Sequence, residues 1–65
     1  MWVEFMTVKN AYAAETWSEL FAAEGLSIRI VPPIGHGESA SMRDARTLYV
    51  PTGKAHVARE ILRKI

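Results

Sequence analysis

The sequence contains no cysteine, no long apolar run and almost no net charge. Without cysteine, neither a disulfide framework nor a cysteine-ligated zinc can stabilise the fold. No stretch approaches the roughly 20 apolar residues of a membrane-spanning helix, so no membrane association is expected. Eight basic and seven acidic side chains leave a formal charge of +1, too little to predict a nucleic-acid-binding protein. Glu4 stands where a signal peptide would carry positive charge, so we expect a cytoplasmic protein.

What the sequence does contain is typical of a small globular domain. Hydrophobic residues make up 49% and charged residues 23% of the 65 positions, which excludes disordered and collagen-like classes. This length allows one domain over residues 1–65, and such a chain buries only about 60% of its unfolded surface. The predicted core is therefore small.

The charges are unevenly distributed along the chain. Residues 1–25 hold four glutamates against one lysine, whereas residues 26–65 hold seven basic against three acidic side chains. Such asymmetry could steer an anionic partner or a complementary second copy of the chain. The alternative is that two helices solvate their outer faces with charges of opposite sign.

Five segments carry the patterns of regular secondary structure. β-Branched and aromatic residues predict a strand over 2–8, and alternation predicts further strands over 26–31 and 46–50. A helix is predicted over 11–24, between Asn10 as N-cap and Gly25 as a left-handed stop. A second is predicted over 53–65, with Thr52 as its candidate N-cap. Residues 32–44 show no periodicity and are expected to form a loop.

Side-chain periodicity assigns each element a buried face. If Glu4 faces solvent, alternation turns Val3, Phe5 and Thr7 inward and leaves Trp2, Met6 and Val8 outside. On the third strand, Leu48 and Val50 point inward and Tyr49 outward. The helical repeat predicts one buried stripe in each helix: Ala13, Ala14, Trp17, Leu20 and Phe21 in the first, and Ala58, Ile61, Leu62 and Ile65 in the last.

The order of these elements predicts an α+β fold. A right-handed crossover places both helices on one face, which gives a ferredoxin-like βαββα sheet that lacks its last strand, with strand order 1-3-2. The first strand then lies at an edge with an apolar outer side, a liability in a monomer. We therefore expect a homodimer through the first strand or the open sheet face, with this interface: Trp2, Met6, Val8 and Tyr49. A monomer in which Trp2 covers the end of the sheet is the alternative.

Several segments are similar to a known family. They are Asn10 before a helix, residues 20–26 running from a helix into a strand, and Leu48-Tyr49-Val50-Pro51 before a helix with Ala58, Ile61 and Leu62. In these the chain resembles the family of prokaryotic signal-transducing proteins of unknown function, whose members are PII-like βαββα domains. The resemblance covers nearly the whole chain and implies a bacterial signalling module whose loop between the second and third strands contacts an effector or partner. It carries over no catalytic residue and no cofactor.

Chemically reactive side chains gather in the long loop. His36, Glu38, Ser39, Arg43 and Asp44 combine an imidazole, carboxylates, a hydroxyl and a guanidinium. Their spacing matches no triad or serine elbow. We therefore expect a non-enzymatic interaction or signalling module, without cofactor, that uses the 32–45 loop to contact its partner or effector. The alternative is an anion or nucleotide sensor, or a minor enzyme, built around four of them: His36, Glu38, Arg43 and Asp44.

Three weaker patterns suggest other ligands. Thr52-Gly53-Lys54 at a helix start suggests a weak anion site, but its flanking residues fail the P-loop pattern, and an ordinary N-cap is the preferred interpretation. His36 and His56 are not at metal-ligand spacing, so no metal site is expected. Trp2 and Tyr49 could stack nucleic-acid bases, but the accompanying basic-aromatic signature is absent and a dimer interface explains the same side chains.

Overall fold

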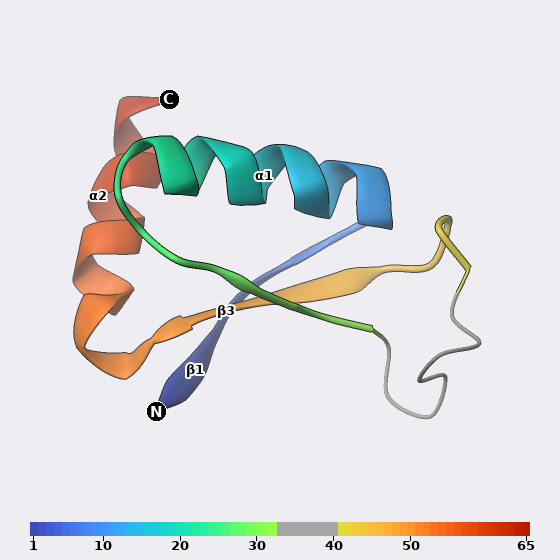
Figure 1. The fold of residues 1–65 in the computed structure, drawn as a ribbon, viewed down its shortest axis with the longest axis horizontal. Coiled ribbons are helices and arrows are strands. Elements are labelled where there is room, and N and C mark those ends of the chain that lie inside the picture. The colour runs from blue at the N-terminus through green and yellow to red at the C-terminus, as the bar shows by residue number, and fades with distance from the viewer. Residues whose placement is uncertain (33–40) are drawn as a thin grey trace.

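The computed structural model describes residues 1–32 and 41–65 and contains three strands and two α-helices in this part of the chain. In chain order they are β1 (Trp2–Val8), α1 (Ala11–Ala23), β2 (Arg29–Val31), β3 (Arg46–Pro51) and α2 (Ala55–Lys64). A single turn of 3-10 helix over Thr52–Lys54 joins β3 to α2. Figure 1 shows this order along the chain, with α1 running above the strands and α2 at one end of the sheet.

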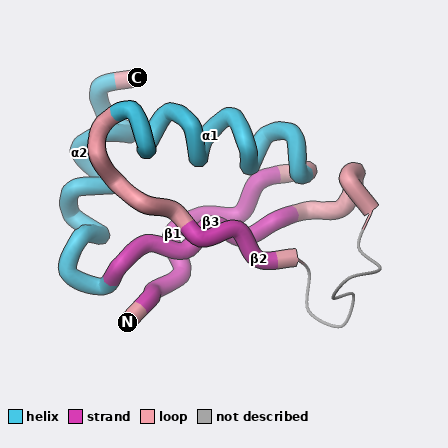
Figure 2. The backbone as a smooth tube through the Cα atoms, in the orientation of Figure 1, coloured by secondary structure: helices cyan, strands magenta, loops and turns pink. Residues whose placement is uncertain are grey.

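The three strands form one antiparallel sheet in the order β1-β3-β2. Residues of both helices pack against the same side of β3, so the helices share one face of the sheet, as the tube in Figure 2 also shows. This confirms the predicted α+β fold and strand order. Since β3 is the central strand, β1 and β2 are both edge strands, and neither of the two described helices covers the second face of the sheet.

Proline accounts for the short length of β2. The predicted strand over 26–31 is wrong at its start, because only Arg29–Val31 pair with β3. The register places Arg29 opposite Tyr49, so its continuation would place Ser27 opposite Pro51. Pro51 has no N–H to give to that pair, and Pro32 lacks one at the other end of the strand. The ladder is therefore limited to three residues.

A β-bulge in β1 reverses the predicted orientation of three side chains. The pairing with β3 shifts between Glu4 and Met6, so Phe5 is an extra residue on β1. Met6 consequently lies beside the inward-facing Leu48, and Val8 is buried in the core. Thr7 lies beside Thr47 and faces away from the helices. The prediction that Met6 and Val8 lie on the outer face, with Thr7 inward, is therefore wrong.

Both ends of α1 are closed as the sequence predicts, with the helix ending at Ala23 rather than Glu24. The Asn10 side-chain Oδ1 accepts a hydrogen bond from the backbone N–H of Ala13 at 2.8 Å. At the other end Gly25 adopts φ 85°, in the left-handed region that glycine enters without steric cost. The Leu26 N–H then donates to the Phe21 carbonyl, which completes a Schellman motif and turns the chain back toward the sheet.

The core lies between the helices and β3. One buried cluster joins α1, α2 and the sheet, and its members are Phe21, Leu26, Val50, Ala58 and Ile61. A second, beneath the first half of α1, contains Val8, Ala14 and Leu48, and Trp17 and Ile28 pack against both. Phe5, supplied by the bulge, meets Phe21 edge to face with ring centroids 5.9 Å apart.

The helical stripes are narrower than predicted. Leu20, Leu62 and Ile65 are exposed rather than buried, whereas Ala11 is buried. The buried side of α1 is centred on Ala14 and Phe21, and Leu20 lies at its margin. Three strands provide too little sheet to cover the last turn of α2, so the apolar stripe of that helix continues into solvent.

Candidate functional site

The face of the sheet opposite the helices is the largest functional candidate among the described residues. Alternating side chains of all three strands point to it, and the strand register arranges them in rows. Glu4, Tyr49 and Arg29 form the middle row, one residue from each strand. The complete set, called the open face below, is Trp2, Glu4, Thr7, Arg29, Val31, Thr47, Tyr49 and Pro51.

A cation–π contact spans the open face. The guanidinium carbon of Arg29 lies 5.0 Å from the centroid of the Trp2 ring. These residues belong to the two edge strands, so the arginine side chain must cross the surface of β3 to reach the indole. Contacts of this kind contribute about 0.5–1 kcal/mol at exposed sites. The contact therefore fixes the position of the Arg29 guanidinium relative to the Trp2 indole.

The open face is apolar and aromatic with balanced charge. Among its eight residues as defined above, Arg29 supplies the positive charge and Glu4 the negative charge. No described residue forms a hydrogen bond or ion pair with the Glu4 carboxylate. Trp2 is 37% exposed and Tyr49 is half-buried, although both are large enough to dominate a contact surface. Electrostatically, such a face suits a neutral or self-complementary partner better than a polyanion.

Of the four residues predicted for a dimer interface, the structure brings two onto the open face. Trp2 lies beside Pro51, and Tyr49 occupies the centre of the middle row. Met6 and Val8 lie on the opposite side of the sheet, beneath α1, because the bulge at Phe5 moves them there. Strict alternation along β1 could not reveal this, whereas the register with β3 does.

The predicted loop site is only partly within the described residues. His36, Glu38 and Ser39 lie outside them. Asp44 closes a turn, since its Oδ2 accepts from the Ser41 N–H at 2.9 Å, and its own N–H donates to the Ser41 carbonyl. Arg43 is exposed, and its backbone N–H donates to the Ser41 hydroxyl at 3.1 Å. These contacts give Asp44 a role in shaping the chain just before β3.

Arg46 is a structural residue that the sequence interpretation missed. Its buried guanidinium donates to three backbone carbonyls, those of Ser41 at 2.8 Å, Asp44 at 2.7 Å and Ala45 at 3.1 Å. The signal was present, because Arg46 shares the alternation of the inward-facing Leu48 and Val50. The arginine anchors the turn over 41–45, and the Met42 carbonyl also accepts from the Ala11 N–H at the start of α1.

The predicted anion site at Thr52-Gly53-Lys54 has a different local structure. The Thr52 N–H and hydroxyl both donate to the Met1 carbonyl, at 2.9 and 3.2 Å. Thr52 is therefore not the N-cap of the last helix, which begins at Ala55 without a side-chain cap from a described residue. The Thr52 N–H is therefore occupied, and Thr52–Lys54 forms a 3-10 turn rather than the start of the long helix that the anion prediction assumed.

Other site classes find little support in the part of the chain that the structure describes. Residues 1–32 and 41–65 contain no group of three histidine, cysteine, aspartate or glutamate side chains placed to hold a metal ion. His56 is exposed on α2. Within the same residues no helix has the length and apolar character needed to cross a membrane. No family model matches the chain, and neither does any curated protein or solved structure.

Proposed function

We propose that this chain is a non-enzymatic binding module that works as a homodimer, with the open face as the contact between its two copies. The observation that carries the proposal is the middle row of that face, Glu4, Tyr49 and Arg29, which runs straight across the sheet. The resemblance to prokaryotic signal-transducing proteins is in keeping with a cytoplasmic signalling role for such a module.

The middle row is self-complementary under a twofold rotation. An axis that runs along β3, between two open faces laid together, exchanges the two edge strands. Glu4 of each copy then faces the Arg29 position of the other, and the two Tyr49 side chains meet at the axis. The Arg29 guanidinium, which lies over Trp2 of its own chain in the structure, exchanges that ring for the Glu4 carboxylate of the other copy. Two pairs of opposite charge thus surround an aromatic centre, which is the arrangement of an isologous interface. The Glu4 carboxylate gains a partner that it lacks among the described residues.

Burial of aromatic and apolar side chains supplies the driving force. Trp2, Tyr49, Val31 and Pro51 lie on a face that neither described helix covers, and removing apolar area from water stabilises a complex. The area is modest, since three strands span only about 15 Å. It lies at the low end of specific interfaces, so we expect a dissociation constant in the micromolar range.

The balanced charge of the face favours a second copy over a nucleic acid. Single-stranded nucleic acids stack on aromatic side chains like Trp2 and Tyr49, but they also need a positive groove for the phosphates. Here Glu4 opposes the charge of Arg29 within one row, and the whole chain carries only +1. The ligand-sensor and enzyme alternatives depend on His36 and Glu38, which the structure does not describe.

A charge-swap cycle tests this proposal. Sedimentation equilibrium between about 10 and 500 µM would compare the wild type with Glu4→Arg, Arg29→Glu and the double variant, a range set by the micromolar affinity expected for a small interface. Each single change places like charges opposite each other and should weaken the dimer at least tenfold. The double variant restores opposite charges with their positions exchanged and should recover most of the affinity. Glu19→Arg on α1 is the matched control and should dimerise like the wild type.

Three outcomes would overturn the proposal. The first is a wild type that stays monomeric over the whole range. The second is a dimer that both single charge reversals leave intact, since that dimer would use another surface, such as the outer edge of β1. The third is salt-sensitive binding of an oligouridylate that quenches tryptophan fluorescence and is lost in Trp2→Ala, because the occupant of the face would then be nucleic acid.

A further inference from the structure

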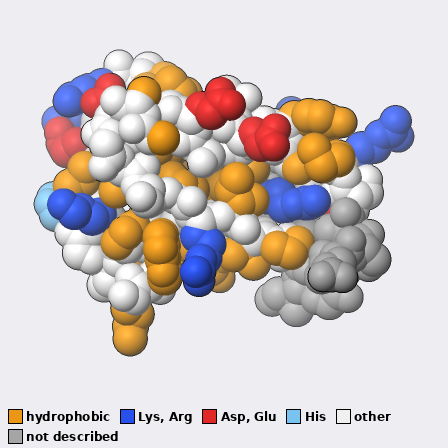
Figure 3. Space-filling view, viewed as in Figure 1, with side chains coloured by type: hydrophobic (Ala, Val, Ile, Leu, Met, Phe, Trp, Pro, Cys, Tyr) orange, Lys and Arg blue, Asp and Glu red, His pale blue; other side chains and the backbone are white. Residues whose placement is uncertain are grey.

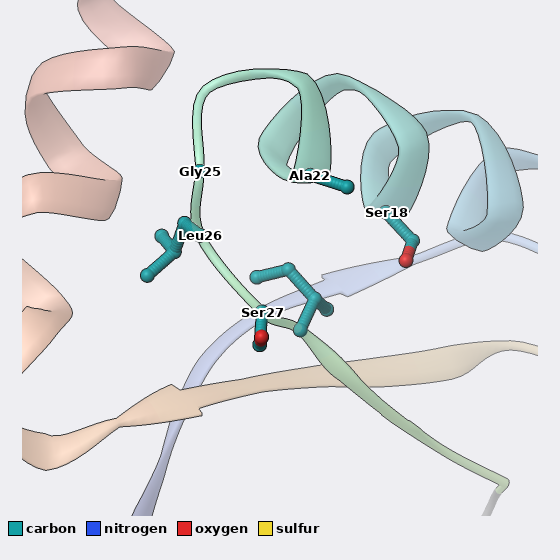
Figure 4. A pocket seen from close by; sticks show the side chains of 6 residues that line it. Ser18, Ala22, Gly25, Leu26 and Ser27 are labelled. Atoms are coloured by element: carbon teal, nitrogen blue, oxygen red, sulfur yellow. The ribbon is translucent and has the colours of Figure 1, made fainter.

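A second, independent candidate lies on the edge of the molecule, between α1 and the chain that leads into β2. A hollow of about 450 Å³ opens there and is lined by Ser18, Ala22, Gly25, Leu26, Ser27 and Ile28. Figure 4 shows the Ser18 side chain pointing down from α1 toward the extended segment, with Ala22 beside it on the same helix. No described residue forms a hydrogen bond with the Ser18 hydroxyl.

We propose that this groove binds an extended, basic peptide segment, which adds as a strand to the free edge of β2. The occupant's backbone would pair with β2, and its cationic side chains would meet acidic residues on α1. This site is separate from the open face and does not depend on the proposed dimer.

The free edge supplies the backbone hydrogen bonds. Among the described strands β2 has β3 as its single neighbour, so alternate N–H and C=O groups of Arg29–Val31 point away from the sheet. Just before the strand, Ser27 and Ile28 take part in no backbone hydrogen bond with any described residue. Ser27, Ile28 and the alternate residues of β2 that face away from β3 thus offer main-chain groups beside the hollow. Strand addition uses such edges, and pockets alongside them select the side chains of the peptide.

The rim of the groove determines the charge of the partner. Glu15 and Glu19 precede Ser18 and Ala22 by three residues each, so the helical repeat places them along the same side of α1. α1 contains no lysine or arginine, and neither glutamate forms an ion pair with a described residue. Figure 3 shows acidic side chains gathered over α1 on this side of the molecule.

The nearest cation of the strand does not neutralise the rim. Arg29 belongs to β2, but its guanidinium lies over the Trp2 ring on the open face, on the other side of the sheet. Within the described part of the chain, the groove is therefore bordered by uncompensated negative charge above and by unpaired backbone below. Lysine or arginine side chains on an extended peptide complement both features, whereas an acidic peptide would be repelled.

NMR titration of the intact protein with defined peptides tests this inference. The probe is a capped hexapeptide of alternating lysine and valine, with a glutamate–valine peptide of equal length as the charge control. The lysine peptide should cause saturable amide shifts at Ser18, Ala22 and residues 25–31, and the glutamate peptide should cause none. A lysine–valine peptide N-methylated at every residue, which has no N–H to donate to β2 from either edge, should bind at least tenfold more weakly.

Two protein variants make the test specific. The double variant Glu15→Lys/Glu19→Lys should weaken binding of the lysine peptide at least tenfold. Thr16→Lys, which adds a positive charge to the same helix away from the groove, should change it less than twofold. Equal binding of the N-methylated peptide, equal binding by the double variant, or shifts confined to the open face would each overturn the inference. Peptide-dependent dimerisation through β2 edges, seen by sedimentation, would overturn it as well, because the occupant would be a second copy.

Discussion

Replacing Arg46 with methionine should destabilise the protein and loosen the turn before β3. The guanidinium is buried at 8% exposure and donates to the carbonyls of Ser41, Asp44 and Ala45. Methionine keeps most of the apolar stem and removes all three donors. The turn that these bonds hold also supplies the Met42 carbonyl to the Ala11 N–H at the start of α1. Loss of the three Arg46 hydrogen bonds should therefore loosen both the turn over 41–45 and the start of α1.

The expected magnitude follows from the three bonds. A hydrogen bond from a charged donor contributes about 1.5–3 kcal/mol, but such values are not additive. The carbonyls lie on partly exposed residues, so water will solvate them after the substitution. We therefore expect a loss of about 2–3 kcal/mol, a large share of the roughly 3–10 kcal/mol available to a domain of this length. At about 5 °C per kcal/mol, the melting temperature should fall by about 10–15 °C.

Thermal unfolding followed by circular dichroism, together with amide hydrogen exchange, would measure both effects. The Arg46→Met protein should also exchange the Ser41, Asp44 and Ala11 amide protons faster, since each is hydrogen-bonded in or against this turn. Arg43→Met makes the same chemical change three residues away on an exposed side chain and should leave stability within about 0.5 kcal/mol. If Arg46→Met and Arg43→Met have the same melting temperature and the same amide exchange rates, Arg46 does not stabilise this turn.

Two further predictions concern the ends of α1. Gly25→Ala should lower the free energy of unfolding by about 1 kcal/mol in chemical denaturation, because Gly25 has φ 85°. No described atom lies within 4 Å of the position of the added Cβ, so the loss comes from backbone strain and not from a clash. Gly53→Ala is the control, because its added Cβ also meets no described atom and Gly53 does not have a left-handed backbone, so its stability should not change. Equal losses of stability in Gly25→Ala and Gly53→Ala would contradict this account. Asn10→Ala should lower the free energy of unfolding by about 1 kcal/mol, because it removes the 2.8 Å hydrogen bond from the Ala13 N–H to the Asn10 side chain. Asn10→Asp keeps an acceptor oxygen and should retain most of the stability in the same assay. Similar losses for both variants would show that the cap contributes little.

The fold was predictable because its determinants are local. Asn10 and Gly25 define the first helix through capping chemistry that acts within a few residues. The chirality of the crossover then leaves few ways to order three strands, and the observed order β1-β3-β2 is the expected one. The shorter β2 has a less local cause, since it depends on Pro51 of another strand as well as on Pro32.

The candidate sites were less predictable because they depend on register. A bulge shifts a strand by one residue and turns every later side chain to the other face, which is what happened to Met6 and Val8. The row of Glu4, Tyr49 and Arg29 joins residues that lie far apart in the sequence, so no local pattern reveals it. The groove beside β2 likewise requires a helix and a strand edge to be placed side by side. Trp2 and Tyr49 were predictable because alternation holds at both positions, since Trp2 precedes the bulge and β3 continues without an extra residue.

The central position of β3 has a consequence for the synthesis of the chain. Both edge strands pair with β3, and β3 spans Arg46–Pro51, so neither described edge strand of this sheet has its partner until those residues have been made. During that interval the nascent chain exposes the apolar segment Trp2–Val8 to other chains. Closing β1 onto β3 also spans a long separation in sequence, which slows folding relative to local hairpins. We therefore expect a released fragment that stops before Arg46 to engage chaperones, whereas a chain that includes β3 should not.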